Sequence, residues 1–153
     1  MAMGKALIVV ALAASLAACG RRAPGASPDG AVRELVERMR RIHGDPAEAR
    51  AAYELLSKRA RQNLVERAKR YSAASGKAIA PEAMIAPSRF LLRFEPQRYT
   101  AHLVGEQARV DVVGLIAGHR ASVPCVFEDG GWRVDLALPA LPPVQMRPGS
   151  GQL

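Results

Sequence analysis

Two cysteines and three histidines are the side chains of this sequence best suited to act as nucleophiles, metal ligands or proton carriers. Cys19 closes a short apolar run, and Cys125 stands alone in the alternating segment ASVPCVFEDG. A cysteine nucleophile needs a histidine base beside it, but we expect His43, His102 and His119 at a helix end, on a solvated sheet face and in a turn. A single remaining cysteine also cannot make a zinc site. We therefore expect no metal, cofactor or catalytic residue, and expect Cys125 to be a small buried hydrophobe.

The residues before Cys19 indicate a different chemistry for its sulfur. The apolar run of residues 6–16 is shorter than the roughly 20 residues of a membrane-spanning helix, but it suits the central region of a signal peptide. The following LAAC resembles the lipobox of bacterial lipoprotein precursors. That resemblance implies cleavage after residue 18, a diacylglyceryl group on Cys19 and usually acylation of the new amino terminus. The alternative is a chance cysteine in an ordinary signal or anchor helix.

The lipobox resemblance predicts where the mature chain would be held. Two or more acyl chains bind a protein firmly to a bilayer, so residues 19–27 would be a tether on the cell membrane or outer membrane. Gly20 takes the position where aspartate, in enterobacterial lipoproteins, favours the inner membrane. Arg21 and Arg22 would then lie at the level of the lipid headgroups, or simply in a solvated linker. The folded part would face the periplasm or the cell exterior.

Composition indicates one globular domain behind this tether. About 135 residues follow the signal, enough for a single domain, and 49% of the chain is hydrophobic against 24% charged. We place the domain at residues 28–138 and an extended Pro/Gly-rich tail at 139–153. The net charge of +8 is concentrated in the amino-terminal half. Nucleic acid is a poor partner, because only 5% of residues are aromatic and no recognition signature is present.

Three helices are predicted in the first half of the domain. Ser27, Asp45 and Ser57 are suitable N-caps, and Gly76 is suited to end the last helix. The third segment, 57–76, carries one apolar stripe and an opposite basic face, made of Lys58, Arg59, Arg61, Arg67, Lys69 and Arg70. That face is either solvated or in contact with an anionic surface, such as lipid, lipopolysaccharide or a cell-wall polymer.

The second half changes to alternating polarity. Four strand-like runs, RYTAHLV, ARVDVVGLI, RASVPCVFE and WRVDLAL, are separated by short turns and therefore predict an antiparallel meander. One face should be covered by the helices, and we expect it to carry Tyr99, Ala101, Leu103, Val110, Val112, Val123, Cys125, Phe127, Trp132, Val134 and Leu136. The other face carries charged side chains, which we read as solvated cross-strand pairs.

Helices followed by a curved four-strand meander resemble the nuclear-transport-factor-2-like superfamily of cone-shaped α+β domains. The resemblance covers residues 28–138 and is best seen in AYELLSKRAR at 52–61 and in the final hairpin VPCVFEDGGWRVDL at 123–136. The superfamily includes many bacterial lipoproteins of unknown function. It implies a pocket between sheet and helices, which some relatives use for ligands or isomerase chemistry.

Three functions remain open at this level. The predicted inward face carries no carboxylate, unlike the isomerase-like relatives, which favours a non-enzymatic binding or scaffolding domain in the envelope. An isomerase- or hydrolase-like enzyme using the cone pocket is the second hypothesis, with Tyr53, Tyr71 and Trp132 either lining that pocket or filling the core. A structural module that forms a homodimer through its sheet is the third.

Overall fold

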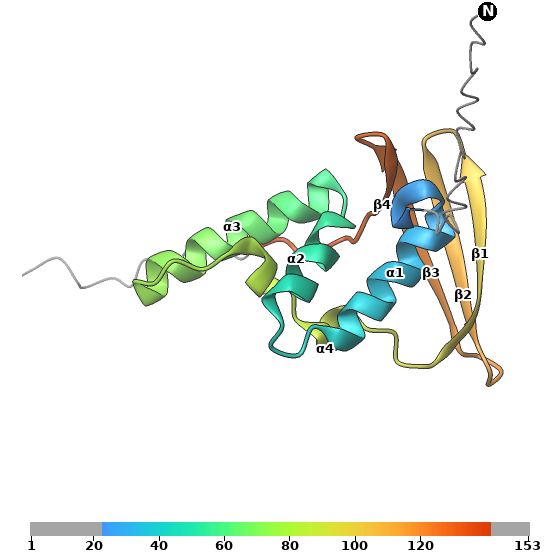
Figure 1. Ribbon diagram of the computed structural model, residues 1–153, viewed down its shortest axis with the longest axis horizontal. Helices are drawn as coiled ribbons and strands as arrows, with labels where there is room; N and C mark the ends of the chain where they lie inside the picture. Colours follow the sequence, from blue (N-terminus) through green and yellow to red (C-terminus); the bar gives the residue numbers. More distant parts are fainter. Residues whose placement is uncertain (1–22, 142–153) are drawn as a thin grey trace, which may run out of the picture.

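The structure is a computed structural model, and it describes residues 23–141. The predicted signal peptide, Cys19, Arg21, Arg22 and residues 142–153 of the predicted tail lie outside the described residues. Helical segments come first and strands second, as Figure 1 shows. The elements are η1 (Pro24–Ala26), α1 (Pro28–Arg41), α2 (Pro46–Glu54), α3 (Lys58–Ser75), η2 (Pro81–Met84), α4 (Pro87–Phe90), β1 (Pro96–Val104), β2 (Gln107–Gly114), β3 (Arg120–Glu128) and β4 (Gly131–Val134).

The predicted helix caps are confirmed. The Ser27 hydroxyl accepts a hydrogen bond from the Gly30 amide at 3.2 Å, and the Asp45 carboxylate accepts one from the Ala47 amide at 2.8 Å. Gly76 ends α3 in the left-handed conformation, at φ +69°, which glycine adopts without strain. None of the described helices is long and apolar enough to cross a membrane.

The four strands form one antiparallel sheet in the order β1-β2-β3-β4. The α+β class and the four-strand meander are therefore confirmed. The β1–β2 and β3–β4 turns lie at one end of the sheet, and the β2–β3 turn lies at the opposite end. The position of these turns determines which side chains lie at each end of the sheet.

The core lies between α1 and one face of the sheet. Buried side chains of α1, Val32, Leu35 and Met39, pack in one cluster with Val110 and Val134 of the strands. Val112, Cys125 and Trp132 are also buried, so the predicted inward face is correct along most of its length.

Leu103 and Phe127 lie on the predicted inward face, opposite buried Ala108 and Trp132, but the prediction that the helices cover them is wrong. Leu103 is 58% exposed and Phe127 is 40% exposed. Leu103 lies on the edge strand β1, beside the β1–β2 turn, and Phe127 lies beside the β3–β4 turn. At this end of the sheet fewer side chains pack over the inward face. The Phe127 ring still contacts Trp132 edge to face, with centroids 5.5 Å apart.

The expectation that all the helices cover the sheet holds only for α1, which packs against every strand. The junction between α2 and α3 instead extends the sheet at β4. The Ser57 amide donates to the Val134 carbonyl at 2.9 Å, and the Val134 amide donates to the Leu55 carbonyl at 2.8 Å. From this junction α3 runs away from the sheet and packs beside η2 (Figure 1).

The described residues contain a core cluster of their own. Among residues 23–141, the buried residues of this cluster lie between Ala31 and Val134, and the hydrophobics packed against it extend to Leu138. The first cap, Ser27, also follows Ala23. A fragment of residues 23–153 therefore keeps the whole core and its caps, and we expect it to fold on its own.

Candidate functional site

The face of the sheet opposite α1 is not covered by any helix of residues 23–141, and it carries the polar side chains of alternate strand positions. We call it the outer face. Its residues include Arg98, Thr100, His102, Arg109, Asp111, Arg120, Ser122, Pro124 and Asp135. Most of them are exposed, as the sequence alternation predicts.

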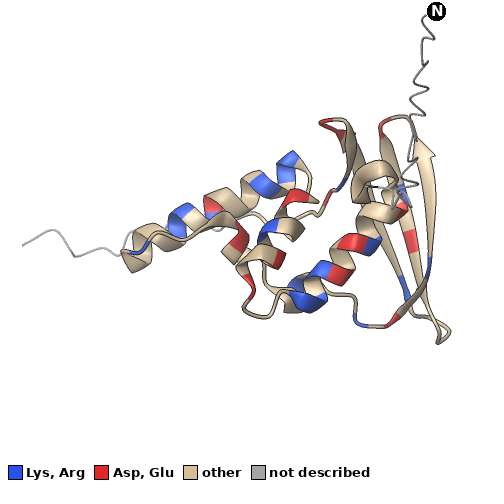
Figure 2. Cartoon of the chain, viewed as in Figure 1, with Lys and Arg blue, Asp and Glu red and all other residues tan. Residues whose placement is uncertain are grey.

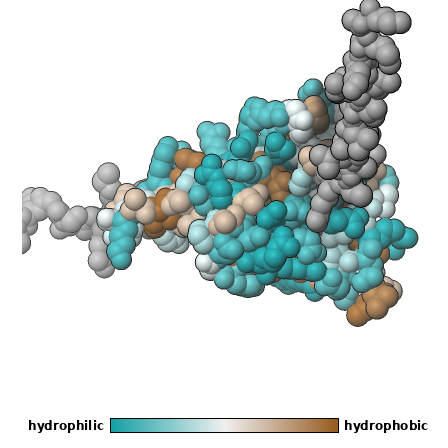
Figure 3. All heavy atoms as spheres, in the orientation of Figure 1, coloured by the Kyte–Doolittle hydropathy of each residue, from teal (hydrophilic) through white to brown (hydrophobic). Residues whose placement is uncertain are grey.

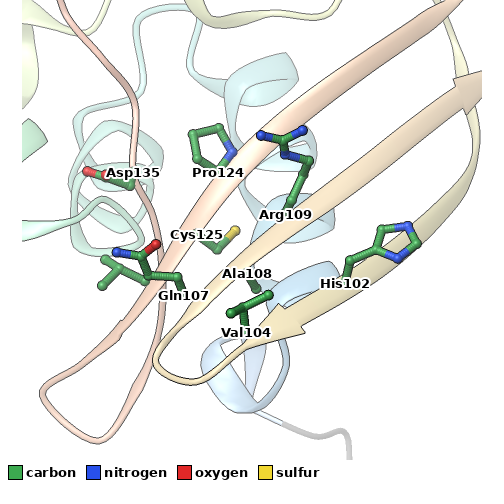
Figure 4. Close-up of a pocket in the computed structure, with 9 residues that line it drawn as sticks. His102, Val104, Gln107, Ala108, Arg109, Pro124, Cys125 and Asp135 are labelled. Carbon is green, nitrogen blue, oxygen red and sulfur yellow. The ribbon is translucent and has the colours of Figure 1, made fainter.

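A hollow of about 440 Å³ lies on this side of the sheet (Figure 4). Its wall includes one cross-strand row, in which His102 pairs with Arg109 and Arg109 pairs with Pro124. The Asp135 amide donates to the Pro124 carbonyl at 2.8 Å, so the row continues to the chain after β4. Cationic and anionic groups are thus presented on one shallow, open surface, which suits binding of a polar partner.

Next to the hollow, Asp111 links a histidine and a serine. Its Oδ2 lies 3.2 Å from Nε2 of His102, and its Oδ1 accepts a hydrogen bond from the Ser122 hydroxyl at 3.0 Å. In a serine nucleophile the hydroxyl hydrogen-bonds to the histidine, and the carboxylate lies behind that histidine. Here the carboxylate lies between the two, so the arrangement orients His102 and Ser122 without activating the hydroxyl.

Cys125 is confirmed as a core residue. Its side chain is buried, with 3% of the residue exposed, and its Sγ lies 3.9 Å from the Pro28 carbonyl oxygen. Burial raises the pKa of the thiol to about 12, and the negative charges of Asp135 and Asp29 add to this effect. The thiol is therefore neutral at physiological pH, which is the unreactive form of cysteine.

A polar cluster that the sequence did not reveal joins the helices to the sheet. The Ser57 hydroxyl donates to Oδ1 of Asp135 at 2.6 Å, and Arg59 donates to both carboxylate oxygens at 3.1 and 2.8 Å. Partial burial raises the pKa of Asp135, but the hydrogen bonds from Arg59 and Ser57 and the Arg59 charge outweigh it, so the net shift is downward. The charged carboxylate thus stabilises this junction.

The basic face predicted on α3 is partly neutralised by ion pairs. Lys58 Nζ lies 2.7 Å from Asp129, and Arg61 lies 3.6 Å from the same carboxylate. The pKa of Asp129 is lowered, first by its hydrogen bond with Lys58. Lys69 pairs with Glu66 at 3.0 Å. Figure 2 shows basic and acidic residues interspersed on and around α3.

Arg67, the remaining residue predicted to contact an anionic surface, is held by neutral acceptors. Its Nε donates to the Asn63 side chain at 2.7 Å, and its Nη2 donates to the Pro139 carbonyl at 2.6 Å. The guanidinium therefore points toward the chain that follows β4. The basic face of α3 therefore has fewer side chains available to an anionic partner than its sequence predicts.

The outer face, by contrast, carries cations without partners. Arg98, Arg109 and Arg120 form no hydrogen bond or ion pair through their side chains within residues 23–141. They come from β1, β2 and β3, and all three are exposed. Three cations that are free to meet an anionic partner therefore share this one face of the sheet.

The turn between β2 and β3 exposes two large apolar side chains. Leu115 is 85% exposed and Ile116 is 62% exposed. We call these two residues the hairpin tip. The hydrophobic patch at the lower right of Figure 3 corresponds to this end of the sheet. Exposed apolar side chains grouped at one projection are typical of interaction sites.

The tip is attached to an ordered turn. The Gly114 amide donates to the His119 carbonyl at 2.8 Å, and the His119 amide donates to the Ile116 carbonyl at 3.0 Å. The His119 ring stacks on Phe94, with centroids 5.3 Å apart. His119 is thus a structural residue of the turn, and the backbone of the tip is held while its side chains face solvent.

The aromatic residues proposed for a pocket are not brought together. Trp132 is buried at 8% exposure, whereas Tyr71 is 61% exposed near the end of α3. Tyr53 is half-buried against the core, with the Arg50 guanidinium 5.8 Å from its ring centre. None of the three lines the hollow on the outer face.

Metal and histidine chemistry add no further site in the described part of the chain. His43 and His102 are exposed. Residues 23–141 contain no group of three or more histidine, cysteine or acidic side chains placed to hold a metal ion.

No family model, curated protein or solved structure matches this chain. Its function must therefore be inferred from the chemistry of its own residues.

Proposed function

We propose that this chain is a lipid-anchored envelope protein of the bacterial lipoprotein class, whose folded domain binds or scaffolds at the membrane surface without catalysis. The LAAC motif behind an apolar run supports the anchor at Cys19. The observation that carries the proposal for the domain is the grouping of unpaired arginines and two exposed apolar side chains on one sheet. The partner that fits this surface is an anionic bilayer.

The finer fold relationship is also a proposal. A four-strand meander with α1 across one face supports a relationship to the nuclear-transport-factor-2-like superfamily. The course of α3, which leaves the sheet at the Ser57 junction, differs from a cone closed by all its helices.

The place where the chain reaches the sheet supports a particular orientation on the membrane. The segment η1 lies against β4 so closely that a Cβ on Gly25 would come within 2.8 Å of Nη1 of Arg133. Ala23 is therefore near the end of the sheet that carries the β3–β4 turn, and the hairpin tip is at the opposite end (Figure 1).

The lipid anchor before Ala23 and the hairpin tip lie at opposite ends of the sheet, and both can contact the same bilayer in only one orientation of the domain. The four-residue step from Cys19 to Ala23 spans at most about 14 Å, whereas a nine-residue strand is about 30 Å long. The sheet therefore lies along the membrane surface, with its outer face toward the headgroups. In this arrangement Arg98, Arg109 and Arg120 meet anionic lipid, and Leu115 and Ile116 enter the interfacial region.

Vesicle co-sedimentation of the 23–153 fragment tests this function. Each basic residue near an anionic surface contributes about 1 kcal/mol, so the triple variant Arg98→Gln, Arg109→Gln, Arg120→Gln should bind phosphatidylglycerol vesicles about a hundredfold more weakly. The matched control, Lys58→Gln, Arg61→Gln, Lys69→Gln, removes the same formal charge from α3 and should bind nearly as wild type.

Two results would contradict the proposal for the outer face. One is equal weakening by the two triple variants, since binding would then depend on net charge alone. The other is failure of the wild-type fragment to bind anionic vesicles at low ionic strength, where screening is weakest.

Dimerisation is a second candidate function, and the uncovered sheet favours it. An antiparallel sheet with one bare face can pair with a copy of itself. Sedimentation equilibrium of the 23–153 fragment measures whether a dimer forms. A dimer through the outer face would hide Arg98, Arg109 and Arg120, so vesicle binding would be lost at protein concentrations where the dimer is present.

A further inference from the structure

A second hollow, of about 380 Å³, lies on the helical side of the molecule. It is bounded by α3, by the η2–α4 segment and by the chain that leaves β4. Its apolar wall includes Leu64, Met84, Phe90 and Leu138. A hollow of this size is within the usual range for small-ligand sites, which are mostly apolar with a few polar groups.

Local sequence forms this hollow. Pro81 and Pro87 begin two short helical turns, so the chain stays close to α3 without making a longer helix. On the other side, the Arg67 guanidinium holds the Pro139 carbonyl at 2.6 Å. The hollow thus has walls from two consecutive segments, α3 and η2–α4, and from the chain after β4, which is distant from both in sequence.

Two guanidinium groups are the charged groups of the hollow. Arg67 is bonded to Asn63 and Pro139 through neutral oxygen atoms, so its charge is not balanced by those bonds. Arg89 makes no side-chain hydrogen bond or ion pair with the described residues. Among the residues 23–141 that line the hollow, none carries a carboxylate.

We propose that this hollow binds a small amphipathic anion, a single carboxylate on an unbranched hydrocarbon chain. The hydrocarbon chain would lie against the apolar wall, and the carboxylate would accept hydrogen bonds from Arg89 and from the free N–H groups of Arg67. Guanidinium and carboxylate are complementary in shape and charge. The proposal does not depend on Cys19 or on the outer face, so either one can fail without the other.

The chain's own tail is the competing occupant. Residues 142–153 follow shortly after Pro139, and in the 23–153 fragment they carry Arg147 and the terminal carboxylate of Leu153. The Arg147 side chain is repelled by Arg67 and Arg89, whereas the terminal carboxylate of Leu153 is a direct competitor, which is why the test includes a fragment without residues 142–153.

Calorimetric titration of the 23–153 fragment tests the site, with decanoate as the probe, kept below its micellar concentration. Because a hydrogen bond to a charged group is worth a factor of about ten or more in affinity, decanol should bind at least tenfold more weakly than decanoate. Arg89→Gln should lower decanoate affinity about tenfold and leave decanol affinity unchanged. Lys77→Gln removes one charge near the end of α3, outside the hollow, and is the matched control.

Any one of four outcomes would overturn the proposal, the second and third of which are comparisons. The first is no saturable decanoate binding. The second is equal affinity for decanoate and decanol. The third is an equal effect of Arg89→Gln and Lys77→Gln. The fourth is decanoate binding that rises at least tenfold when the fragment ends at Leu141, which would identify the tail as the occupant.

Discussion

The hydroxyl of Ser57 lies 2.6 Å from Oδ1 of Asp135, joining the α2–α3 junction to the chain that follows β4 across 78 positions of sequence. The same hydroxyl accepts a hydrogen bond from the Ala60 amide at 3.1 Å and so caps α3. Ser57 is buried, at 2% exposure. One small side chain therefore fixes both the start of α3 and its attachment to the sheet.

Replacing this residue should lower stability measurably. Ser57→Ala removes a helix cap, worth about 0.5–2 kcal/mol, and a hydrogen bond to a charged group, worth about 1.5–3 kcal/mol. We expect a total loss of about 2–5 kcal/mol in the free energy of unfolding by urea. Ser122→Ala removes an exposed hydroxyl bonded to Asp111 and should change stability by less than about 0.5 kcal/mol. Equal effects would contradict the role given to Ser57.

The same cluster predicts a pH dependence. The pKa of Asp135 in the folded protein lies below its ordinary value of 3.8, so the unfolded chain takes up its proton first as pH falls. The stabilisation by Asp135 is complete above that ordinary value and is lost as pH falls through the folded pKa. Asp135→Asn should remove this part of the acid-side loss, measured by urea unfolding from pH 7 down to pH 2. An unchanged slope would show that Asp135 does not contribute.

Trp132 and Tyr71 form a matched pair of aromatic positions. Trp132 is buried in the core, and Trp132→Ala should cost about 3–5 kcal/mol. Tyr71 is exposed near the end of α3, and Tyr71→Ala should cost less than about 0.5 kcal/mol. Thermal unfolding of the 23–153 fragment measures both. A melting temperature unchanged by Trp132→Ala would reverse the face assigned to β4.

Cys19 is tested by membrane fractionation of the full chain. If its sulfur carries the anchor, Cys19→Ser should leave an unprocessed precursor or release protein to the soluble fraction, and metabolic labelling with palmitate should be lost. Cys125→Ser changes the other cysteine, which is buried, and should keep the label. A Cys19→Ser protein that is processed and fractionates as wild type contradicts the lipoprotein proposal.

Local sequence signals were enough to predict the helix caps and the meander, because these depend on neighbouring residues. Ser27, Asp45 and Ser57 cap the helices where expected, and Gly76 ends α3. The direction of α3 could not be predicted in this way. It depends on the backbone hydrogen bonds of Val134 with Ser57 and Leu55, which are far from it in the sequence and are not specified by any periodicity.

The candidate site was less accessible to sequence reasoning than the fold. The ion pairs of Lys58 and Arg61 with Asp129 join α3 to the β3–β4 turn. Because Asp129 is far from both residues in the sequence, local reasoning could not show that its charge partly neutralises the basic face of α3. Leu115 and Ile116 follow directly on the strand-like run ARVDVVG, and the sequence pattern predicts them as part of that strand. The glycine at 114 and the hydrogen bond from its amide to His119 instead begin the turn there, which leaves both side chains exposed.

The most direct test of the membrane orientation is the depth of the hairpin tip in a bilayer. A nitroxide label on Leu115→Cys in the 23–153 fragment reports that depth, since Cys125 is buried and its thiol is neutral. With phosphatidylglycerol vesicles, we predict that the label becomes more accessible to oxygen and less accessible to a polar chromium complex, while a label on Lys77→Cys stays aqueous. A fragment that sediments with the vesicles while the label at 115 stays aqueous would contradict the proposed orientation.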